Sequence, residues 1–226
     1  MILAEEVALL LIDDISGKAV VDSTRLELAL AGSVLLELAE SGRVDVAARG
    51  EQVKAGRLVV RDPRPTGDPV LDEALRRIAT TKPRTPETML PLLQKGLRAE
   101  VFARLVKRGI LRFEEKRALG IFSTRSWPST GSGERRALRT ALYEVLVTGR
   151  AATPHEAAMI SMVHAVDAVP KVLGDVGVKG HELRRRAKAA GHGGLADTAV
   201  RRAIDAVNSA MLVVVAGAAA GAASSS

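Results

Sequence analysis

The sequence of 226 residues contains no cysteine and few aromatic side chains. Without cysteine the chain can form no disulfide, no thiolate metal site and no cysteine nucleophile. Aromatic residues make up only 2% of the chain, and they are Phe102, Phe113, Phe122, Trp127 and Tyr143. This scarcity argues against a β-sandwich or barrel, because those folds favour aromatic and β-branched side chains. A core must therefore be built from Leu, Val, Ile, Ala and Met.

The sequence also lacks a segment that is long and apolar enough to cross a bilayer. The longest apolar run, residues 210–223, is shorter than the roughly 20 residues required and is rich in Gly and Ala. No secretory signal is recognisable, so we expect a cytoplasmic protein. Only four histidines are present, and we expect neither a metal site nor a cofactor. We expect one domain over residues 1–216 and a disordered tail over residues 217–226.

Charge is distributed unevenly along the chain. The net charge is +7, and residues 84–150 alone carry 14 basic and 6 acidic side chains. The preceding residues, 1–83, carry 11 basic and 14 acidic side chains. A local basic excess is typical either of a solvated helix face or of a surface that binds a polyanion.

Helical spacing of apolar residues predicts a mainly α protein. Residues 3–12 form a short helix or a buried segment, and a further helix begins near Pro154 after the cap residue Thr153. Gly42 and Gly109 are placed to end the helices that precede them. Thr85 followed by Pro86 marks a further helix start. The remaining helices are predicted over residues 24–41, 70–80, 97–108, 134–149, 181–191 and 194–216, with Pro170 and residues 174–180 separating the later ones.

Two segments read as short β-hairpins, residues 44–60 and residues 112–127, the second with its tip near residues 116–120. Each follows a helix, so residues 35–60 and 103–125 look like two copies of one helix–hairpin unit. A helix followed by a hairpin is the arrangement of a winged helix, which makes nucleic-acid binding an alternative function.

No arrangement of residues indicates catalysis. The adjacent acidic pairs at 13–14 and 72–73 point in different directions and cannot serve one reacting atom. His164 and Asp167 lie three apart on a helix, but no nucleophile or third ligand accompanies them, which favours a core histidine. The glycines at 174, 177 and 180 lack the strand and the Lys-Ser/Thr ending of a phosphate-binding loop. We therefore expect that the protein is not an enzyme.

Arg98 is the one basic residue that helical periodicity places on an apolar face. Residues 97, 101, 102, 105 and 106 surround it on the wheel, whereas Arg104 and Lys107 lie opposite. An arginine there must extend to solvent, pair with a carboxylate such as Glu27, or meet an anionic ligand. Lys95 is expected beside it, and the helix start adds a positive dipole. Lys95 and Arg98 thus predict a phosphate cradle, with an internal salt bridge as the alternative.

The second hairpin mixes apolar and basic residues. Leu119, Ile121, Phe122 and Trp127 alternate with Lys116, Arg117 and Arg125. This mixture suits contact with anionic lipid headgroups or with a second subunit, although packing against the hairpin's own domain is the simpler alternative.

Several ordered segments carry a family resemblance, of which Pro65-Thr66-Gly67-Asp68 is the most specific. They are residues 3–6, 30–38, 42–44, 65–75, 105–111 and 164–167. With these segments the sequence resembles the Golgi phosphoprotein 3 family, as a bacterial-type member, over about residues 3 to 215. The resemblance implies a single helical domain with a central helix bundle, short β-hairpins and one protruding hairpin.

The resemblance also implies a function. Eukaryotic members are peripheral proteins of the cytosolic Golgi face that bind phosphatidylinositol 4-phosphate in a basic pocket. Two pocket arginines correspond to Lys95 and Arg98, whereas a third corresponds to Ala31 and the pocket tryptophan falls near Asp22. Arg25, one turn from Ala31, is a candidate replacement. The hairpin of relatives contributes to membrane contact and self-association.

Three hypotheses result. The favoured one is a peripheral membrane adaptor that holds an anionic, phosphoinositide-like lipid through Lys95, Arg98 and Arg25 and contacts the bilayer through the hairpin. The hairpin would also mediate homo-oligomerisation. A nucleic-acid-binding regulator ranks second, because its basic residues are not interleaved with stacking aromatic residues. A scaffold for protein clients is the third.

Overall fold

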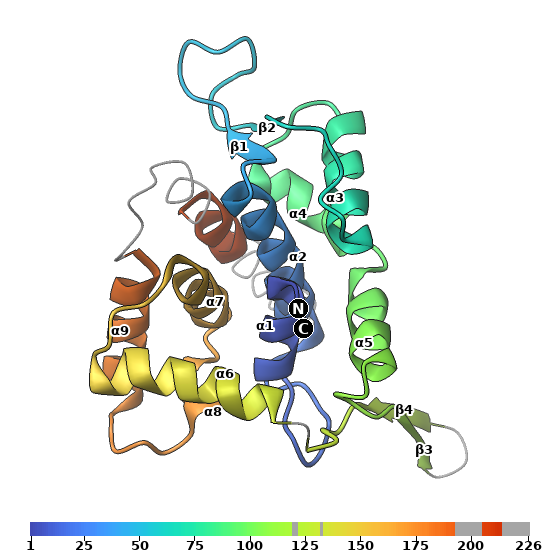
Figure 1. Cartoon of the computed structure of the whole chain (residues 1–226), viewed down its shortest axis with the longest axis vertical. Coiled ribbons are helices and arrows are strands. Elements are labelled where there is room, and N and C mark those ends of the chain that lie inside the picture. Colours follow the sequence, from blue (N-terminus) through green and yellow to red (C-terminus); the bar gives the residue numbers. More distant parts are fainter. Residues whose placement is uncertain (119–121, 132, 193–204, 214–226) are drawn as a thin grey trace, which may run out of the picture.

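The computed structural model describes residues 1–118, 122–131, 133–192 and 205–213, and it is mainly helical (Figure 1). The helices are α1 (Leu3–Leu10), α2 (Ser23–Glu40), α3 (Pro69–Thr80), α4 (Pro86–Gln94), α5 (Leu97–Lys107), α6 (Glu134–Tyr143), α7 (Pro154–Ala165), α8 (Val169–Leu173) and α9 (Gly180–His192). Residues 205–213 are also helical. The predicted fold class, a single helical domain with a central bundle, is confirmed.

The long helix α2 forms the centre of the bundle. It packs against α1, α3, α4, α5 and α7, and most of its residues are buried. Gly32 makes one close approach possible, because a Cβ atom there would lie 2.8 Å from the Sδ atom of Met162. Val207 and Met211 of the last helical segment pack against the same glycine. A small residue at position 32 therefore lets three helices meet in the core.

Local sequence signals explain where several helices begin. The side chain of Asp68 accepts hydrogen bonds from the amides of Val70 and Leu71, and Pro69 occupies the first turn of α3. Thr153 and Glu156 form a reciprocal capping box at the start of α7. These residues satisfy amide groups that a helix start leaves without partners, so the predicted starts are confirmed.

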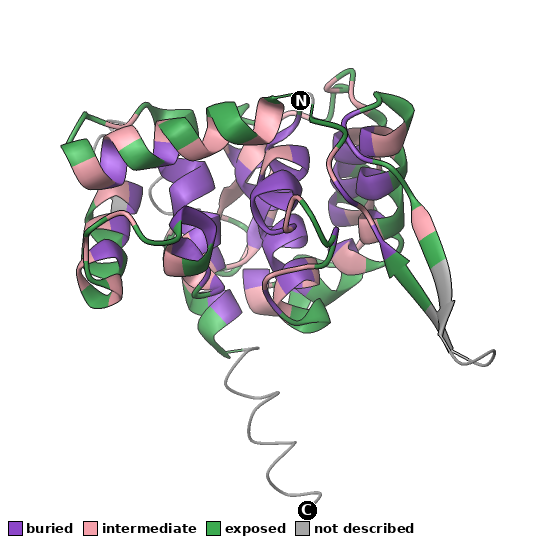
Figure 2. Cartoon of the chain, turned by 90° about the horizontal axis from the view of Figure 1, so that it is seen from below, coloured by how far each residue is buried: buried purple, intermediate pink, exposed green. Residues whose placement is uncertain are grey.

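Two antiparallel hairpins complete the described part of the chain. The strands β1 (Val44–Val46) and β2 (Leu58–Val60) pair with Asp45 opposite Val59. The strands β3 (Glu114–Ala118) and β4 (Phe122–Ser126) pair with Lys116 opposite Thr124, and this hairpin extends away from the helices (Figures 1 and 2). Both predicted hairpins, including the protruding one, are confirmed.

Two helical segments differ from the prediction. The segment around Pro170 was expected only to separate helices, but Pro170 occupies the first turn of the short helix α8, where its missing amide proton costs nothing. The helix expected over residues 134–149 changes after Tyr143 into a π-helical turn, Glu144–Thr148. The predicted tail, residues 217–226, lies outside the described residues.

Candidate functional site

A glycine separates the two basic residues that were expected to share one cradle. Gly96 adopts a left-handed conformation with φ of 79° and caps the start of α5. Lys95 ends α4, whereas Arg98 lies in the first turn of α5. Because the chain reverses its local geometry between them, Lys95 and Arg98 line two different hollows.

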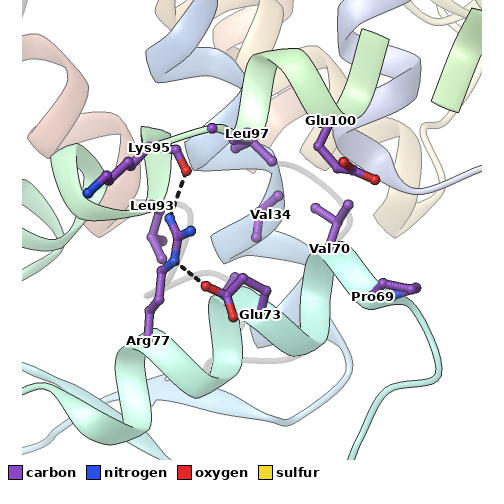
Figure 3. Close-up of a pocket in the computed structure, with 11 residues that line it drawn as sticks. Val34, Pro69, Val70, Glu73, Arg77, Leu93, Lys95, Leu97 and Glu100 are labelled. Atoms are coloured by element: carbon purple, nitrogen blue, oxygen red, sulfur yellow. Dashed lines mark hydrogen bonds and ion pairs between the residues drawn. The ribbon is translucent and has the colours of Figure 1, made fainter. Parts of the chain in front are cut away.

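The hollow beside Lys95 lies between α3 and the α4–α5 junction and encloses about 270 Å³ (Figure 3). Arg77 crosses it, donating to the carbonyl oxygen of Lys95 at 2.9 Å and to a carboxylate oxygen of Glu73 at 2.8 Å. The ammonium group of Lys95 points away from Val34 and Glu100 in Figure 3. The charged groups of this hollow therefore mainly hold two helices together.

The hollow beside Arg98 lies between α5 and the base of the β3–β4 hairpin and encloses about 590 Å³. The guanidinium carbon of Arg98 lies 5.9 Å from the ring centre of Phe102 and 5.7 Å from that of Trp127. Phe113 and Arg125 line the hairpin side. The result is an open, largely apolar hollow with a cation over aromatic rings.

The ion pairs within this hollow are long and partly exposed. Arg98 lies 3.8 Å from a carboxylate oxygen of Glu27, so the predicted salt bridge is present. Arg125 lies 3.3 Å from Glu115, and its side chain is 65% exposed. Exposed pairs of this kind contribute about 0–1 kcal/mol, so an anionic ligand can displace them at little cost.

The other predicted pocket positions lie elsewhere. Arg25 lies 3.5 Å from Asp22, whose carboxylate caps α2, and neither residue lines the Arg98 hollow. Ala31 is fully buried within α2. Of the three basic residues predicted to bind phosphate, only Arg98 reaches the aromatic hollow.

The predicted membrane-contact residues of the hairpin divide into two groups. Leu119 and Ile121 lie outside the described residues, and Phe122 begins β4. Trp127 follows β4, and its ring centre lies 4.8 Å from that of Phe102 and 5.8 Å from that of Phe113. Trp127 is half-buried, so it forms a wall of the Arg98 hollow rather than the tip of the hairpin.

Phe113 is a site residue that sequence reasoning missed, and its side chain is 48% exposed. A signal for it was present, since all five aromatic residues lie between positions 102 and 143 of the chain. Clustering of so scarce a residue type indicates a shared location. In the structure three of them, Phe102, Phe113 and Trp127, contact one another.

A second missed residue is Ile15, which is 91% exposed on the loop between α1 and α2. This loop is fixed to the base of the hairpin, because the amide of Trp127 donates to the carbonyl of Gly17 at 2.8 Å. Gly17 has φ of 64°, and a Cβ atom there would lie 2.3 Å from the backbone nitrogen of Pro128. The fold therefore presents an exposed apolar side chain on a loop that is hydrogen-bonded to the base of the hairpin.

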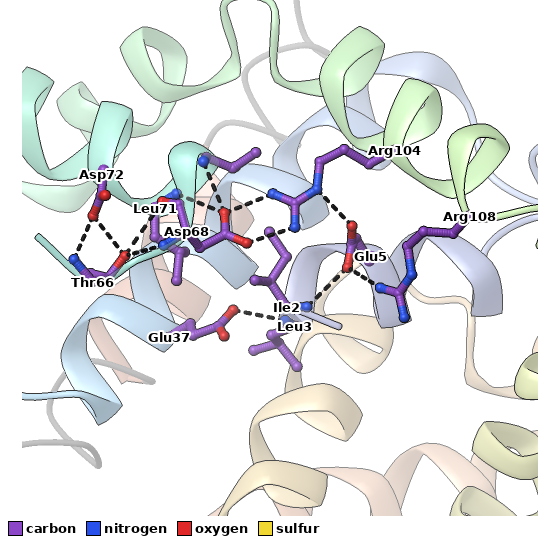
Figure 4. A network of polar contacts seen from close by, with 11 residues as sticks. Ile2, Leu3, Glu5, Glu37, Thr66, Asp68, Leu71, Asp72, Arg104 and Arg108 are labelled. Carbon is purple, nitrogen blue, oxygen red and sulfur yellow. Dashed lines mark hydrogen bonds and ion pairs between the residues drawn. The ribbon is translucent and has the colours of Figure 1, made fainter.

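A separate polar network lies at the other end of α5 (Figure 4). Glu5 is fully buried on α1 and lies 2.9 Å from Arg104 and 3.2 Å from Arg108. Arg104 also donates to both carboxylate oxygens of Asp68, at 2.7 and 2.6 Å. Burial alone would raise the pKa of Asp68, but the hydrogen bonds from Arg104 and the backbone outweigh it and lower the pKa.

This network corrects the helical-wheel prediction for Arg104. The wheel placed Arg104 on the solvent face of α5, but its side chain is only 23% exposed. The wheel considered one helix alone, whereas α1 and the start of α3 cover this face with carboxylates. The Pro65–Asp68 segment and α1 are thereby joined through α5.

Comparison with protein families supplies the last observation on this site. The family model of Golgi phosphoprotein 3 matches residues 3–207, which include every element that forms the Arg98 hollow. Within the described ranges, no helix combines the length and apolar character needed to span a membrane.

Proposed function

The chain belongs to the Golgi phosphoprotein 3 family, and from this premise we propose that it is a peripheral membrane protein that binds anionic phospholipid headgroups from the cytosolic side. The observation that carries the proposal is the hollow in which Arg98 lies over Phe102 and Trp127. A cation beside an apolar, open cavity suits a ligand that has both a negative headgroup and a hydrocarbon portion.

Arg98 supplies the principal phosphate contact in this proposal. Its planar guanidinium can donate two parallel hydrogen bonds to phosphate oxygens, and the aromatic rings hold its orientation. Arg125 on the hairpin side adds a second positive charge. The apolar lining from Phe113 and Val106 leaves room for the glycerol portion of a lipid.

Exposed apolar residues next to the hollow provide the bilayer contact. Ile15 is held on its hydrogen-bonded loop, and Phe113 is exposed at the base of the hairpin. In Figure 1 that loop and the β3–β4 hairpin both lie at the lower end of the molecule. Each basic residue close to an anionic surface adds about 1 kcal/mol, which gives reversible, salt-dependent binding.

The choice of headgroup is a finer part of the proposal. Ala31 is buried, and the Asp22 carboxylate caps α2, so neither position reproduces the family pocket. Lys95 and Arg25 are exposed or half-exposed outside the hollow and act through long-range attraction. We therefore propose a preference for anionic lipids in general, with phosphatidylinositol 4-phosphate as the specific case to test.

The test is flotation with vesicles of phosphatidylcholine alone, with phosphatidylglycerol, and with phosphatidylinositol 4-phosphate, each at low and physiological salt. We expect binding to both anionic vesicles and none to the neutral one. The variant Arg98→Gln/Arg125→Gln should bind at least about tenfold more weakly, from the loss of two surface charges. Ile15→Ser should weaken binding without changing the charge.

The matched control is Arg76→Gln/Arg185→Gln, which removes the same charge from exposed positions on α3 and α9. Equal losses in the two double variants would show that only net charge matters and would contradict the assigned hollow. A gel shift with random duplex DNA tests the winged-helix alternative. Burial argues against that alternative, because the helix of the first helix–hairpin unit, α2, lies at the centre of the bundle and is not presented to a DNA groove.

A further inference from the structure

Helix α6 carries a second group of basic and hydroxyl side chains, away from the Arg98 hollow. The group begins at Arg136 and continues three, four and seven residues later with Arg139, Thr140 and Tyr143. Residues at these spacings lie on one face of a helix. All four line one hollow of about 280 Å³, which α8 and the following loop complete with Leu173 and Val176.

The two arginines of this hollow have no carboxylate partner among the described residues. Within the described ranges, Arg136 is exposed and forms no ion pair, and the one hydrogen bond that the Arg139 side chain donates goes to the carbonyl of Leu173, at 3.1 Å. The one carboxylate at the edge, Asp14, pairs with Arg135. Other exposed arginines differ in this respect, since Arg76 and Arg185 each pair with a glutamate three residues before them on the same helix.

We infer that the α6 hollow is an anion site that binds a phosphomonoester group. Two guanidinium groups one helical turn apart can donate to different oxygens of one phosphate, and the Thr140 and Tyr143 hydroxyls can donate to the remaining oxygens. A phosphomonoester carries more than one negative charge near neutral pH, which matches two unpaired arginines. Leu173 and Val176 form an apolar side against which the carbon portion of the ligand packs.

This site is distinct from the one proposed for membrane docking. Asp14 lines the α6 hollow, and its carbonyl accepts a hydrogen bond from Ser129 at 3.1 Å, whereas the carbonyl of Gly17 in the same loop accepts one from Trp127. The Ile15 loop therefore lies between the two hollows.

The two hollows contain different reporters, because Tyr143 is the only tyrosine and Trp127 the only tryptophan of the chain. The full-length protein labelled with fluorotyrosine and fluorotryptophan would be titrated with glycerol 3-phosphate and followed by NMR. We expect a saturable shift of the tyrosine signal that persists in Arg98→Gln/Arg125→Gln, which separates it from any binding at the Arg98 hollow that the tryptophan reports. The variant Arg136→Gln/Arg139→Gln should lose the tyrosine shift.

The single variant Arg136→Gln covers the case in which loss of the Arg139–Leu173 hydrogen bond disturbs folding. We expect it to bind glycerol 3-phosphate about tenfold more weakly, the usual effect of losing one charge-assisted hydrogen bond. Arg76→Gln is the charge-matched control for this single variant and Arg76→Gln/Arg185→Gln is the control for the double variant, and both should bind as the parent does. Absence of a saturable tyrosine shift, or the same shift in the Arg136→Gln/Arg139→Gln variant, overturns the proposal.

A second arm identifies the source of the phosphate. Vesicles of phosphatidylcholine with phosphatidic acid present the same group on a lipid. Weaker vesicle binding by Arg136→Gln than by the single control Arg76→Gln supports the site with a lipid headgroup as its ligand. Equal vesicle binding, together with a tyrosine shift from glycerol 3-phosphate, supports the site with a soluble ligand.

Discussion

Arg98 and Arg104 lie on the same helix, less than two turns apart, and their surroundings are opposite. Their side chains are 31% and 23% exposed, so burial hardly distinguishes them. Arg104 has two carboxylates within 2.9 Å, whereas Arg98 has one at 3.8 Å and two aromatic rings. Arg104 is thus held by two carboxylates inside the protein, whereas Arg98 has only one distant carboxylate partner among the described residues.

The difference teaches how one helix can carry a structural arginine and also the arginine to which we assign ligand binding. The end of α5 that faces α1 must neutralise the buried Glu5, and the arginine there is engaged by the carboxylates of Glu5 and Asp68. The end near the hairpin faces an open hollow, where aromatic rings orient the arginine without consuming its hydrogen bonds. Partner chemistry, more than exposure, separates a structural arginine from a binding one.

The largest effect on the free energy of unfolding is expected from Arg104→Gln. The variant leaves Glu5 fully buried with only Arg108 as a charged partner and also breaks both hydrogen bonds to Asp68. Breaking a buried ion pair in this way costs about 3–5 kcal/mol of unfolding free energy. Urea unfolding followed by circular dichroism measures it. Lys107→Gln, at the exposed end of the same helix, is the control, and an equally large loss there would contradict the role given to Arg104.

This contrast marks what sequence could and could not predict. Periodicity and caps placed the helices because those signals are local, and the glycines at 42 and 109 ended them with φ of 68° and 71° as expected. The role of Arg104 depends on Glu5, which is 99 positions earlier in the chain. A helical wheel contains no information about the elements that cover each face.

The candidate site shows the same limit. Arg98 was predicted because its position on the wheel is unusual, and this is a local property. Lys95 was expected beside Arg98, but the left-handed Gly96 breaks the helical periodicity between them, and the two residues line different hollows. Ile15 could not be recognised, since its exposure results from a loop fixed to the distant hairpin by Trp127.

A medium effect on the free energy of unfolding is expected from the titration of a second glutamate, Glu40. Its surroundings contrast with those of Glu5. Glu40 has no hydrogen-bond partner within the described structure and lies near Glu37, Glu6 and His155. Burial raises its pKa to about 7, helped by the two other carboxylates and opposed by His155. The pKa of His155 is also raised, chiefly by its hydrogen bond to Glu6.

The sign of the pH dependence follows from these shifts. The unfolded chain releases the Glu40 proton near pH 4.5 and the folded chain near 7, so the folded state binds more protons between them. Stability is therefore greatest below about pH 4.5 for this group and is lost as the pH rises through 7. His155 contributes in the same direction, because its raised pKa stabilises the folded state below about pH 6.5. This contribution is lost as the pH rises through the pKa of the folded state. Because Glu40 is partly exposed, we expect a decrease of about 1 kcal/mol.

The variant Glu40→Gln tests this dependence through urea unfolding at several pH values. It should flatten the decrease between about pH 5 and pH 8 and be more stable than the parent at the upper end. Glu100→Gln, an exposed change on α5, should leave the slope unchanged. A slope that stays the same in Glu40→Gln would assign the pH dependence to other groups.

The smallest effect on stability is expected from Arg98→Gln, the counterpart of Arg104→Gln on the same helix. The variant loses one long ion pair to Glu27 and a half-exposed contact with two rings, which together account for about 1 kcal/mol or less. A double-mutant cycle with Glu27→Gln measures the pair directly, and its coupling should be below about 0.5 kcal/mol. A loss comparable with that of Arg104→Gln would mean that Arg98 is held as firmly as Arg104 and has no donors to offer a lipid. A small loss of stability combined with a large loss of vesicle binding is the combination that separates the two arginines, because a residue with only a structural role would change both together.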